Sequence, residues 1–94
     1  DNHFFLSAIE DFDIFIKNNP EEPSGYLYRG LAKKSLLFGS RIKGIKSKIN
    51  YLKDSNKDFK KAVIKSPSNL LKTRIEKLIK ENEEAIKVIN ENIY

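Results

Sequence analysis

One spacing of residues occurs twice in this chain and limits its fold more than any other feature. The pair Asp11-Phe12 precedes Pro20, with eight residues from the phenylalanine to the proline, and Asp58-Phe59 precedes Pro67 at the same distance. Proline stops a helix because the residue before it avoids the helical conformation. The repeated spacing therefore predicts two equivalent helices, each ended by a proline.

The apolar residues between Phe4 and Lys17 recur at the spacing of one face of a helix. The residues that form this face are Phe5, Ala8, Ile9, Phe12, Phe15 and Ile16. Phe4 and Ile14 widen the face, so we expect a helix that is apolar over much of its circumference. Such a helix needs neighbours on two sides.

A second helix is predicted to open near Ser24, after an acidic turn that follows Pro20. Proline suits the first turn of a helix and serine is a favourable cap, which fits the sequence Glu22-Pro23-Ser24. Gly30, in the middle of this helix, costs up to about 1 kcal/mol relative to alanine. We expect close approach of a partner helix to compensate, and the small Ala32 serves the same end.

Beyond Leu37 the sequence allows two interpretations. Either Phe38-Gly39-Ser40 makes a tight turn between two long helices, or a flexible basic loop links two helices of ordinary length. Heptad spacing of apolar residues favours the long hairpin, with Asn56 as the one polar interruption. These residues are Ile42, Ile45, Ile49, Leu52, Phe59 and Val63. Gly44 counts against the first turn of the second helix.

A sustained apolar stripe from Asn69 to Ile93 predicts a long last helix, interrupted by the polar Asn82. The stripe consists of Leu71, Ile75, Leu78, Ile79, Ile86, Ile89 and Ile93. The other side is charged and is expected to face solvent: Glu76, Lys77, Lys80, Glu83, Glu84 and Lys87. The whole chain, residues 1–94, is therefore predicted to be one all-α domain of about four helices and no strands.

The proline-ended helices and the small residues after the turn resemble the tetratricopeptide repeat. This helix–turn–helix unit of about 34 residues binds other proteins. The resemblance is carried by the repeated Asp-Phe and proline spacing and by Tyr26, Gly30 and Ala32. Arg29 and Lys33 depart from it, because the family usually has a large apolar side chain at one or both of these places.

The resemblance implies antiparallel helical hairpins with about one and a half repeats and a capping helix. The divisions are a half repeat at 4–20, a repeat at 23–67 with an insertion at about 38–50, and a capping helix at 68–93. Terminal helices with a polar outer face are typical of such arrays.

Residue types exclude several classes of protein. The chain has no cysteine, so disulfides and thiolate metal sites are ruled out. No apolar run approaches the roughly 18 residues of a membrane span, and no signal-peptide pattern is present. The absence of an Asn-x-Ser/Thr sequon favours an intracellular, cytoplasmic setting.

The net charge of +5 conceals a strong segregation along the chain. Residues 1–23 carry a balance of −5, residues 24–74 a balance of +12, and residues 75–94 a balance of −2. This asymmetry would steer an anionic partner, or would let the ends and the middle of the chain attract each other.

Few residues suit catalysis. His3 is the only histidine, lies at the start of the chain and has no second ligand at helical spacing. Glu10, Asp11 and Asp13 flank an apolar stripe and are expected to be solvated, whereas a paired-carboxylate site needs convergence in a pocket. Asp11 and Asp58 fall at equivalent points, where capping or a salt bridge is the simplest role. We therefore expect no enzyme activity, no cofactor and no metal.

The resemblance also implies a binding groove along the first helix of each unit. Its groove-facing positions in this chain are Ser24, Leu27, Leu31, Lys34 and Ser35. Leu27 and Leu31 stand where members that clamp a terminal carboxylate have lysine and asparagine. The groove is therefore expected to be apolar with a basic end, suited to an amphipathic helix or a hydrophobic peptide. In the alternative interpretation both leucines belong to the core beneath the first or last helix.

A basic run is the other candidate for binding. It comprises Arg41, Lys43, Lys46, Lys48, Lys53, Lys57, Lys60, Lys61 and Lys65. Clustered basic residues along a helix are the electrostatic footprint of phosphate binding. Lysines outnumber arginines and few aromatics interleave, so base readout has little support. A solvated face is the favoured interpretation.

Together these patterns predict a non-catalytic module that binds a helical or extended peptide of a partner protein. A second hypothesis is self-assembly into a homo-oligomer, because an apolar face without a cover usually marks an interface. That face would consist of Phe4, Phe5, Phe12 and Phe15. Binding of nucleic acid or another anionic partner to the basic helix is a third and weaker hypothesis.

Overall fold

The computed structural model describes residues 2–38, 44–66 and 68–91. Within these ranges the chain forms four α-helices and no strand, which confirms the predicted all-α class. The helices are α1 (Asn2–Asn18), α2 (Pro23–Phe38), α3 (Ile45–Lys65) and α4 (Asn69–Glu91). None of them is long and apolar enough to cross a membrane.

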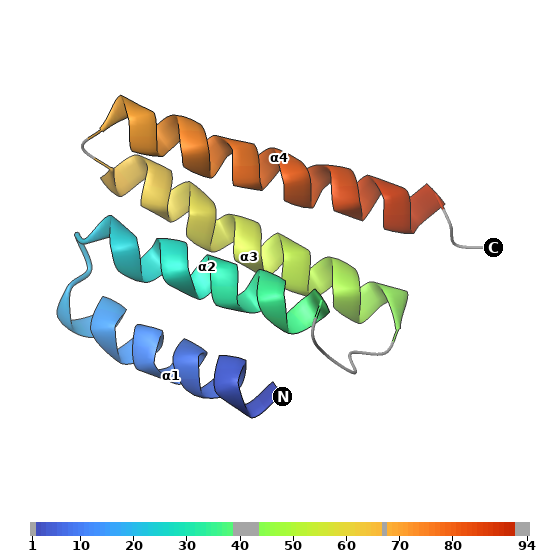
Figure 1. Cartoon of the computed structure of the whole chain (residues 1–94), viewed down its shortest axis with the longest axis horizontal. Helices are drawn as coiled ribbons and strands as arrows, with labels where there is room; N and C mark the ends of the chain where they lie inside the picture. Colours follow the sequence, from blue (N-terminus) through green and yellow to red (C-terminus); the bar gives the residue numbers. More distant parts are fainter. Residues whose placement is uncertain (1, 39–43, 67, 92–94) are drawn as a thin grey trace.

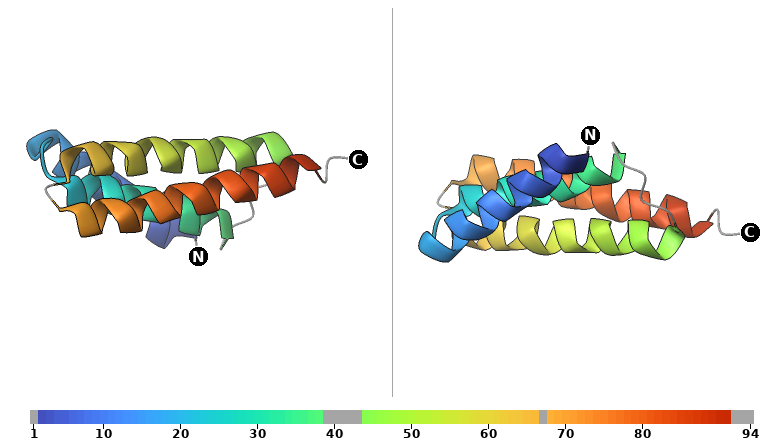
Figure 2. Two further views of the ribbon diagram at one scale, coloured as in Figure 1. Left: turned by 90° about the horizontal axis from the view of Figure 1, so that it is seen from above. Right: turned by 90° about the horizontal axis from the view of Figure 1, so that it is seen from below.

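The helices lie side by side in chain order, and each runs antiparallel to the one before it (Figure 1). The main packing contacts join α1 to α2, α2 to α3 and α3 to α4. The molecule is accordingly a thin body of 43 × 29 × 16 Å, as the edge-on views in Figure 2 show. This serial packing is compatible with a helical repeat, and it leaves α1 and α4 at the two edges.

The turn between α1 and α2 forms where the sequence predicts it. The backbone N–H of Asn19 donates to the carbonyl of Phe15 at 2.8 Å, and the Asn19 side chain donates to the same oxygen at 3.1 Å. The hydroxyl of Tyr26 donates to the carbonyl of Pro20 at 3.0 Å. Helix α2 begins at Pro23, one residue before Ser24, because proline has its φ preset for a first helical position.

The predicted close approach at Gly30 is confirmed, and the partner is α3. A Cβ atom at Gly30 would lie 2.6 Å from Cε1 of Phe59, whose side chain is fully buried. The hydroxyl of Ser55 also donates to the carbonyl of Gly30, at 2.8 Å. Only glycine lets the two backbones come this close.

The core lies where α2, α3 and α4 meet. Its central cluster consists of Tyr26, Phe59, Ala62 and Ile75. Side chains that are partly buried against this cluster are Ile16, Leu27, Leu31, Val63, Leu71, Leu78 and Ile79. Most of α1 therefore lies beside the core and not within it.

Residues 45–50 are helical, as the long-hairpin interpretation expects. Gly44 comes just before α3 at a φ of 92°, a conformation that favours glycine. Gly39, Ser40, Arg41, Ile42 and Lys43 lie outside the described residues, as does Ile93 of the predicted stripe.

Candidate protein-binding surface

Helix α1 is an edge helix with large apolar side chains exposed. Its main packing contacts are with α2 alone, so one side of its apolar surface lacks a neighbour among the described residues. Phe4 is 72% exposed, Ile14 61% and Phe15 38%. The predicted need for neighbours on two sides is therefore met on one side only. Exposed apolar side chains that gather in one patch usually mark an interaction site.

Two hollows join along one side of α1. The first, of about 540 Å³, is lined by Phe4, Ser7, Ala8, Asp11 and Phe12. The second, of about 370 Å³, lies between α1 and α2 and is lined by Asp11, Phe12, Phe15, Ser24, Gly25 and Tyr28. Because Asp11 and Phe12 border both, the hollows form one groove. We call its α1 wall, made of Phe4, Ala8, Asp11, Phe12 and Phe15, the α1 face.

Aromatic rings dominate this groove. The rings of Phe12 and Tyr28 stack with their centroids 6.0 Å apart and an angle of 23° between their planes. Phe4 and Phe5 meet edge to face at 5.3 Å. Phe5 and Phe12 are half-buried, whereas Phe4, Phe15 and Tyr28 are exposed. Aromatic side chains offer large apolar area at low entropy cost, which is why they are enriched at interfaces.

The repeated spacing makes the α1 face equivalent to the side of α3 that α2 covers. Ser55, Asp58, Phe59 and Ala62 on that side of α3 are all buried. Their equivalents on α1 are Ala8, Asp11, Phe12 and Phe15, which border the open groove. In α3 this pattern is covered by α2. In α1, Phe12 and Phe15 contact a neighbouring helix, at Tyr28 and Gly25 of α2, and the rest of the pattern borders the open groove.

Asp58 is the centre of an ion-pair network that joins α2 to α3 and α1. The guanidinium of Arg29 donates to both of its carboxylate oxygens, at 2.9 and 2.6 Å, and Nζ of Lys33 lies 3.0 Å from Oδ2. Arg29 also reaches Asp13 on α1, at 2.8 Å. The hydrogen bonds that Arg29 donates to Asp58 raise the pKa of Arg29 above its already high ordinary value. The salt bridge predicted at Asp58 is confirmed, and it explains why Arg29 and Lys33 depart from the repeat pattern.

Asp11, the equivalent of Asp58, has no such partners. Its side chain is exposed, and no basic residue in the described part of the chain forms an ion pair with it. Asp13, which was expected to be solvated, takes the bond to Arg29 instead. Asp11 is therefore an available carboxylate at the centre of an aromatic groove.

The groove predicted along α2 is less accessible than the one on α1. All five of its residues, Ser24, Leu27, Leu31, Lys34 and Ser35, are half-buried. Leu27 and Leu31 pack against the core cluster, and Nζ of Lys34 lies 3.1 Å from Oε1 of Glu81 on α4. Ser24 lines the α1–α2 hollow. These contacts favour the alternative in which both leucines belong to the core.

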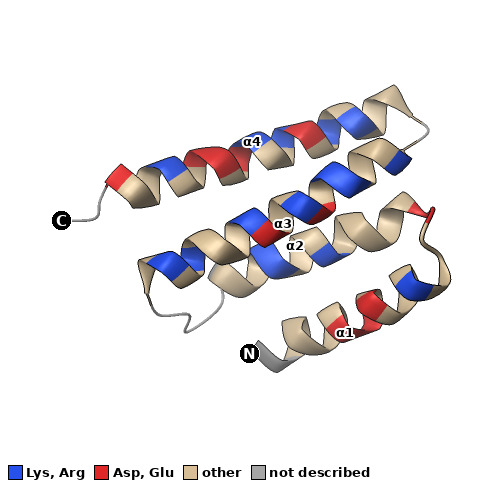
Figure 3. Ribbon diagram, turned by 180° about the vertical axis from the view of Figure 1, so that it is seen from behind, with Lys and Arg blue, Asp and Glu red and all other residues tan. Residues whose placement is uncertain are grey.

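The predicted basic patch follows α3, opposite in sign to the acidic α1 (Figure 3). Lys46, Lys53, Lys57, Lys60 and Lys61 are exposed and Lys48 is half-buried, while Arg41 and Lys43 lie outside the described residues. The last three exposed lysines border a hollow of about 340 Å³ together with Arg29, Lys33, Asp54 and Asp58. The two carboxylates offset part of its charge.

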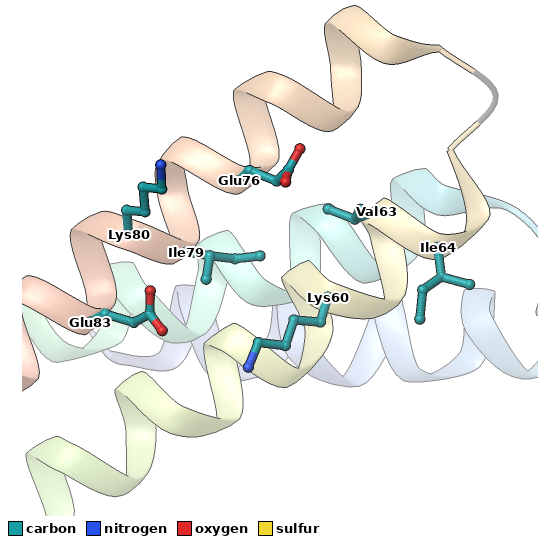
Figure 4. Close-up of a pocket in the computed structure, with 7 residues that line it drawn as sticks. All are labelled: Lys60, Val63, Ile64, Glu76, Ile79, Lys80 and Glu83. Atoms are coloured by element: carbon teal, nitrogen blue, oxygen red, sulfur yellow. The ribbon is translucent and has the colours of Figure 1, made fainter.

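A further hollow, of about 450 Å³, lies between α3 and α4 (Figure 4). It is lined by Lys60, Val63, Ile64, Glu76, Ile79, Lys80 and Glu83. Ile64 is 77% exposed there. Its lining combines charged residues of both signs with three aliphatic side chains, so this hollow lacks the aromatic character of the α1 groove.

Comparisons of this chain with protein-family models, with curated proteins and with solved structures find no significant match. The described residues include no group of three or more His, Cys, Asp or Glu side chains placed to hold a metal ion. The geometry of the surfaces is therefore the basis on which a function is proposed. Sequence patterns indicated the phenylalanines of the α1 face. They did not indicate Tyr28, which belongs to none of the patterns described above.

Proposed function

We propose that this chain is a non-catalytic protein-interaction module, similar to a tetratricopeptide repeat unit, that binds an α-helix of a partner protein along the α1 face. The observation that carries the proposal is the exposure of Phe4 and Phe15 beside a continuous hollow. Full burial of one phenylalanine side chain contributes about 1.5–3 kcal/mol. Covering this groove would therefore supply a substantial part of a binding free energy.

A helix is the shape that fits this surface best. The packed pairs α1–α2, α2–α3 and α3–α4 each consist of two antiparallel helices that lie side by side. The open groove runs beside α1 from Phe4 to Phe15, about three helical turns, which matches the anchor spacing of helix-in-groove recognition. An additional helix would extend the layer at its open edge.

A neutral amphipathic peptide of leucine, alanine and glutamine tests the proposal. Titrated into the labelled protein, it should shift the amide resonances of α1 and of Tyr28. Phe4→Glu should weaken binding by at least about tenfold, since it places a charge in the groove. Ile64→Glu is the matched control, because it makes the same kind of change at an exposed residue of α3 and should leave binding unchanged. Shifts confined to α2 and α4 would contradict the proposal.

Self-assembly is the second candidate, because a second copy would also cover the phenylalanines. Charge argues against a symmetric contact between two α1 helices. Glu10, Asp11 and Asp13 of one copy would lie close to the same residues of the other, and like charges across an interface are destabilising. We therefore place a partner protein ahead of a homodimer.

Binding of nucleic acid or another anionic partner has the least support. Asp54 and Asp58 lie among the basic residues of the α3 hollow, and Lys57 lies 3.9 Å from Asp54. An anion would have to approach these carboxylates. Affinity of this kind would fall steeply with salt concentration.

A further inference from the structure

The contact between α2 and α3 shows what kind of helix fits a surface carrying this Asp-Phe pattern. At the crossing point α2 has Gly30, and a side chain there would collide with Phe59. Arg29, immediately before the glycine, and Lys33, three residues after it, both bind Asp58. The helix that covers an Asp-Phe pair in this fold thus presents a small residue with basic residues on either side of it.

The same requirements apply to the α1 face. Asp11 and Phe12 have the spacing of Asp58 and Phe59, both pairs lie on α-helices, and Asp11 is exposed without an ion-pair partner in the described part of the chain. Because Ala8, Asp11 and Phe12 are the equivalents of Ser55, Asp58 and Phe59, the hollow over them corresponds to the place that α2 takes on α3. Close approach of two helices needs a small residue at the crossing, and a nearly buried carboxylate needs a cation.

We infer that the helix bound on the α1 face carries glycine or alanine where it crosses Phe12, an arginine or lysine immediately before that residue, and a second basic residue three positions after it. The inference rests on the proposed function and adds the chemistry of the partner. Its basic residues would pair with Asp11, as Arg29 and Lys33 pair with Asp58.

Two differences between the surfaces refine this description. Ala8 takes the place of Ser55, whose hydroxyl donates a hydrogen bond to the carbonyl of Gly30. Helix α1 therefore offers no such hydrogen bond to the backbone carbonyl of the partner at this point. Phe15 replaces the fully buried Ala62 and fills more space. The partner helix should therefore have a smaller side chain near Phe15 than the Tyr26 that α2 places in the cluster with Ala62, and the sequence of α2 itself should bind α1 less tightly than such a helix.

The required helix comes from another protein and not from a second copy. Two segments of this chain have the required pattern, and both are already engaged within the fold. Arg29 and Gly30 of α2 contact α3. In α3, Ala62 follows Lys61 and precedes Lys65 by three positions, and it is fully buried in the core. Helix α1 of a second copy has the wrong charge. A basic helix from another protein is complementary to the acidic α1, and such complementarity favours specificity and fast association.

The sequence of α2 itself provides the probe. A synthetic peptide of residues 23–38 should bind the intact protein and shift the resonances of α1. A peptide with Arg29→Glu and Lys33→Glu should bind about tenfold more weakly, and a peptide with Gly30→Leu should be weakened at least as much. Peptide binding is measured by fluorescence anisotropy, with the site located by amide shifts.

A charge exchange on the protein isolates the role of Asp11. Asp11→Lys should lower the affinity for the unmodified peptide about tenfold and should restore the affinity for the charge-reversed peptide. Glu10→Lys makes the same charge change at a neighbouring exposed residue that lines neither hollow, and it should change affinity by less than about twofold.

Each outcome separates the inference from the proposed function. If the neutral and charge-reversed peptides bind the α1 face as tightly as the unmodified one, the basic partner is wrong while helix binding stands. If the Gly30→Leu peptide binds undiminished, the close crossing is wrong. If no peptide shifts α1, both the inference and the proposed function fail.

Discussion

Nδ2 of Asn82 on α4 donates a hydrogen bond to Oδ1 of Asn56 on α3, at 2.8 Å, between two buried side chains. The same amide donates to the hydroxyl of Ser55 at 3.1 Å, and Nδ2 of Asn56 donates to the carbonyl of Ile79 at 3.3 Å. Each asparagine interrupts an apolar stripe, and the two interruptions meet. Paired buried polar residues of this kind can fix the register of packed helices.

Replacing one asparagine should cost more than replacing both. Asn82→Leu removes the donor and leaves Oδ1 of Asn56 buried without it, so we expect a loss of about 1–3 kcal/mol in the free energy of unfolding. The double variant Asn56→Leu/Asn82→Leu should lose less than the sum of the single changes. Urea unfolding followed by circular dichroism measures all of these values. Additive losses would show that the hydrogen bond carries no coupling.

Arg29 should be the most sensitive charged residue for stability. Arg29→Met removes the bidentate partner of Asp58, which is only 2% exposed, and should destabilise the fold by roughly 3 kcal/mol. Because a raised pKa stabilises the fold at every pH below the ordinary pKa of arginine, this contribution is lost only at extreme alkaline pH. The difference between wild type and variant should stay constant from about pH 7 to about pH 9. Urea unfolding across that range checks both statements.

Leu31→Glu separates the two interpretations of the α2 residues. Leu31 packs against the core cluster, so a glutamate there should lower the free energy of unfolding by more than about 2 kcal/mol. Phe4→Glu, at a residue 72% exposed, should leave stability within about 0.5 kcal/mol of wild type. A stable Leu31→Glu protein that no longer binds peptide would return the binding site to α2.

Light scattering over a range of concentrations should give the mass of a monomer. The reason is the repulsion between acidic α1 helices, which opposes the simplest symmetric dimer. A mass of two chains that does not change with concentration would instead mean that a second copy covers the phenylalanines. In that case Phe4→Glu and Phe15→Glu should restore the monomer, whereas Ile64→Glu should not.

The sequence alone determined which segments are helices. Apolar periodicity and the prolines are local signals, because a helix repeats every 3.6 residues and its stops depend on adjacent residues. Gly30 also predicted a close contact between helices, since a glycine inside a helix lowers its stability unless such a contact compensates. The apolar face of phenylalanines on α1 was also predicted from the sequence, because helical periodicity is a local signal.

The tertiary structure decided which of these faces meet. Nothing local to Asn56 or Asn82 says that they pair, and nothing local to Arg29 says that it joins Asp13 to Asp58. Leu27 and Leu31 lie on an apolar side of α2 whether that side is core or groove. The choice depends on helix crossing angles and register, which the packing of distant side chains sets. That packing buries the Asp-Phe pair of α3 and leaves the equivalent pair of α1 beside an open groove.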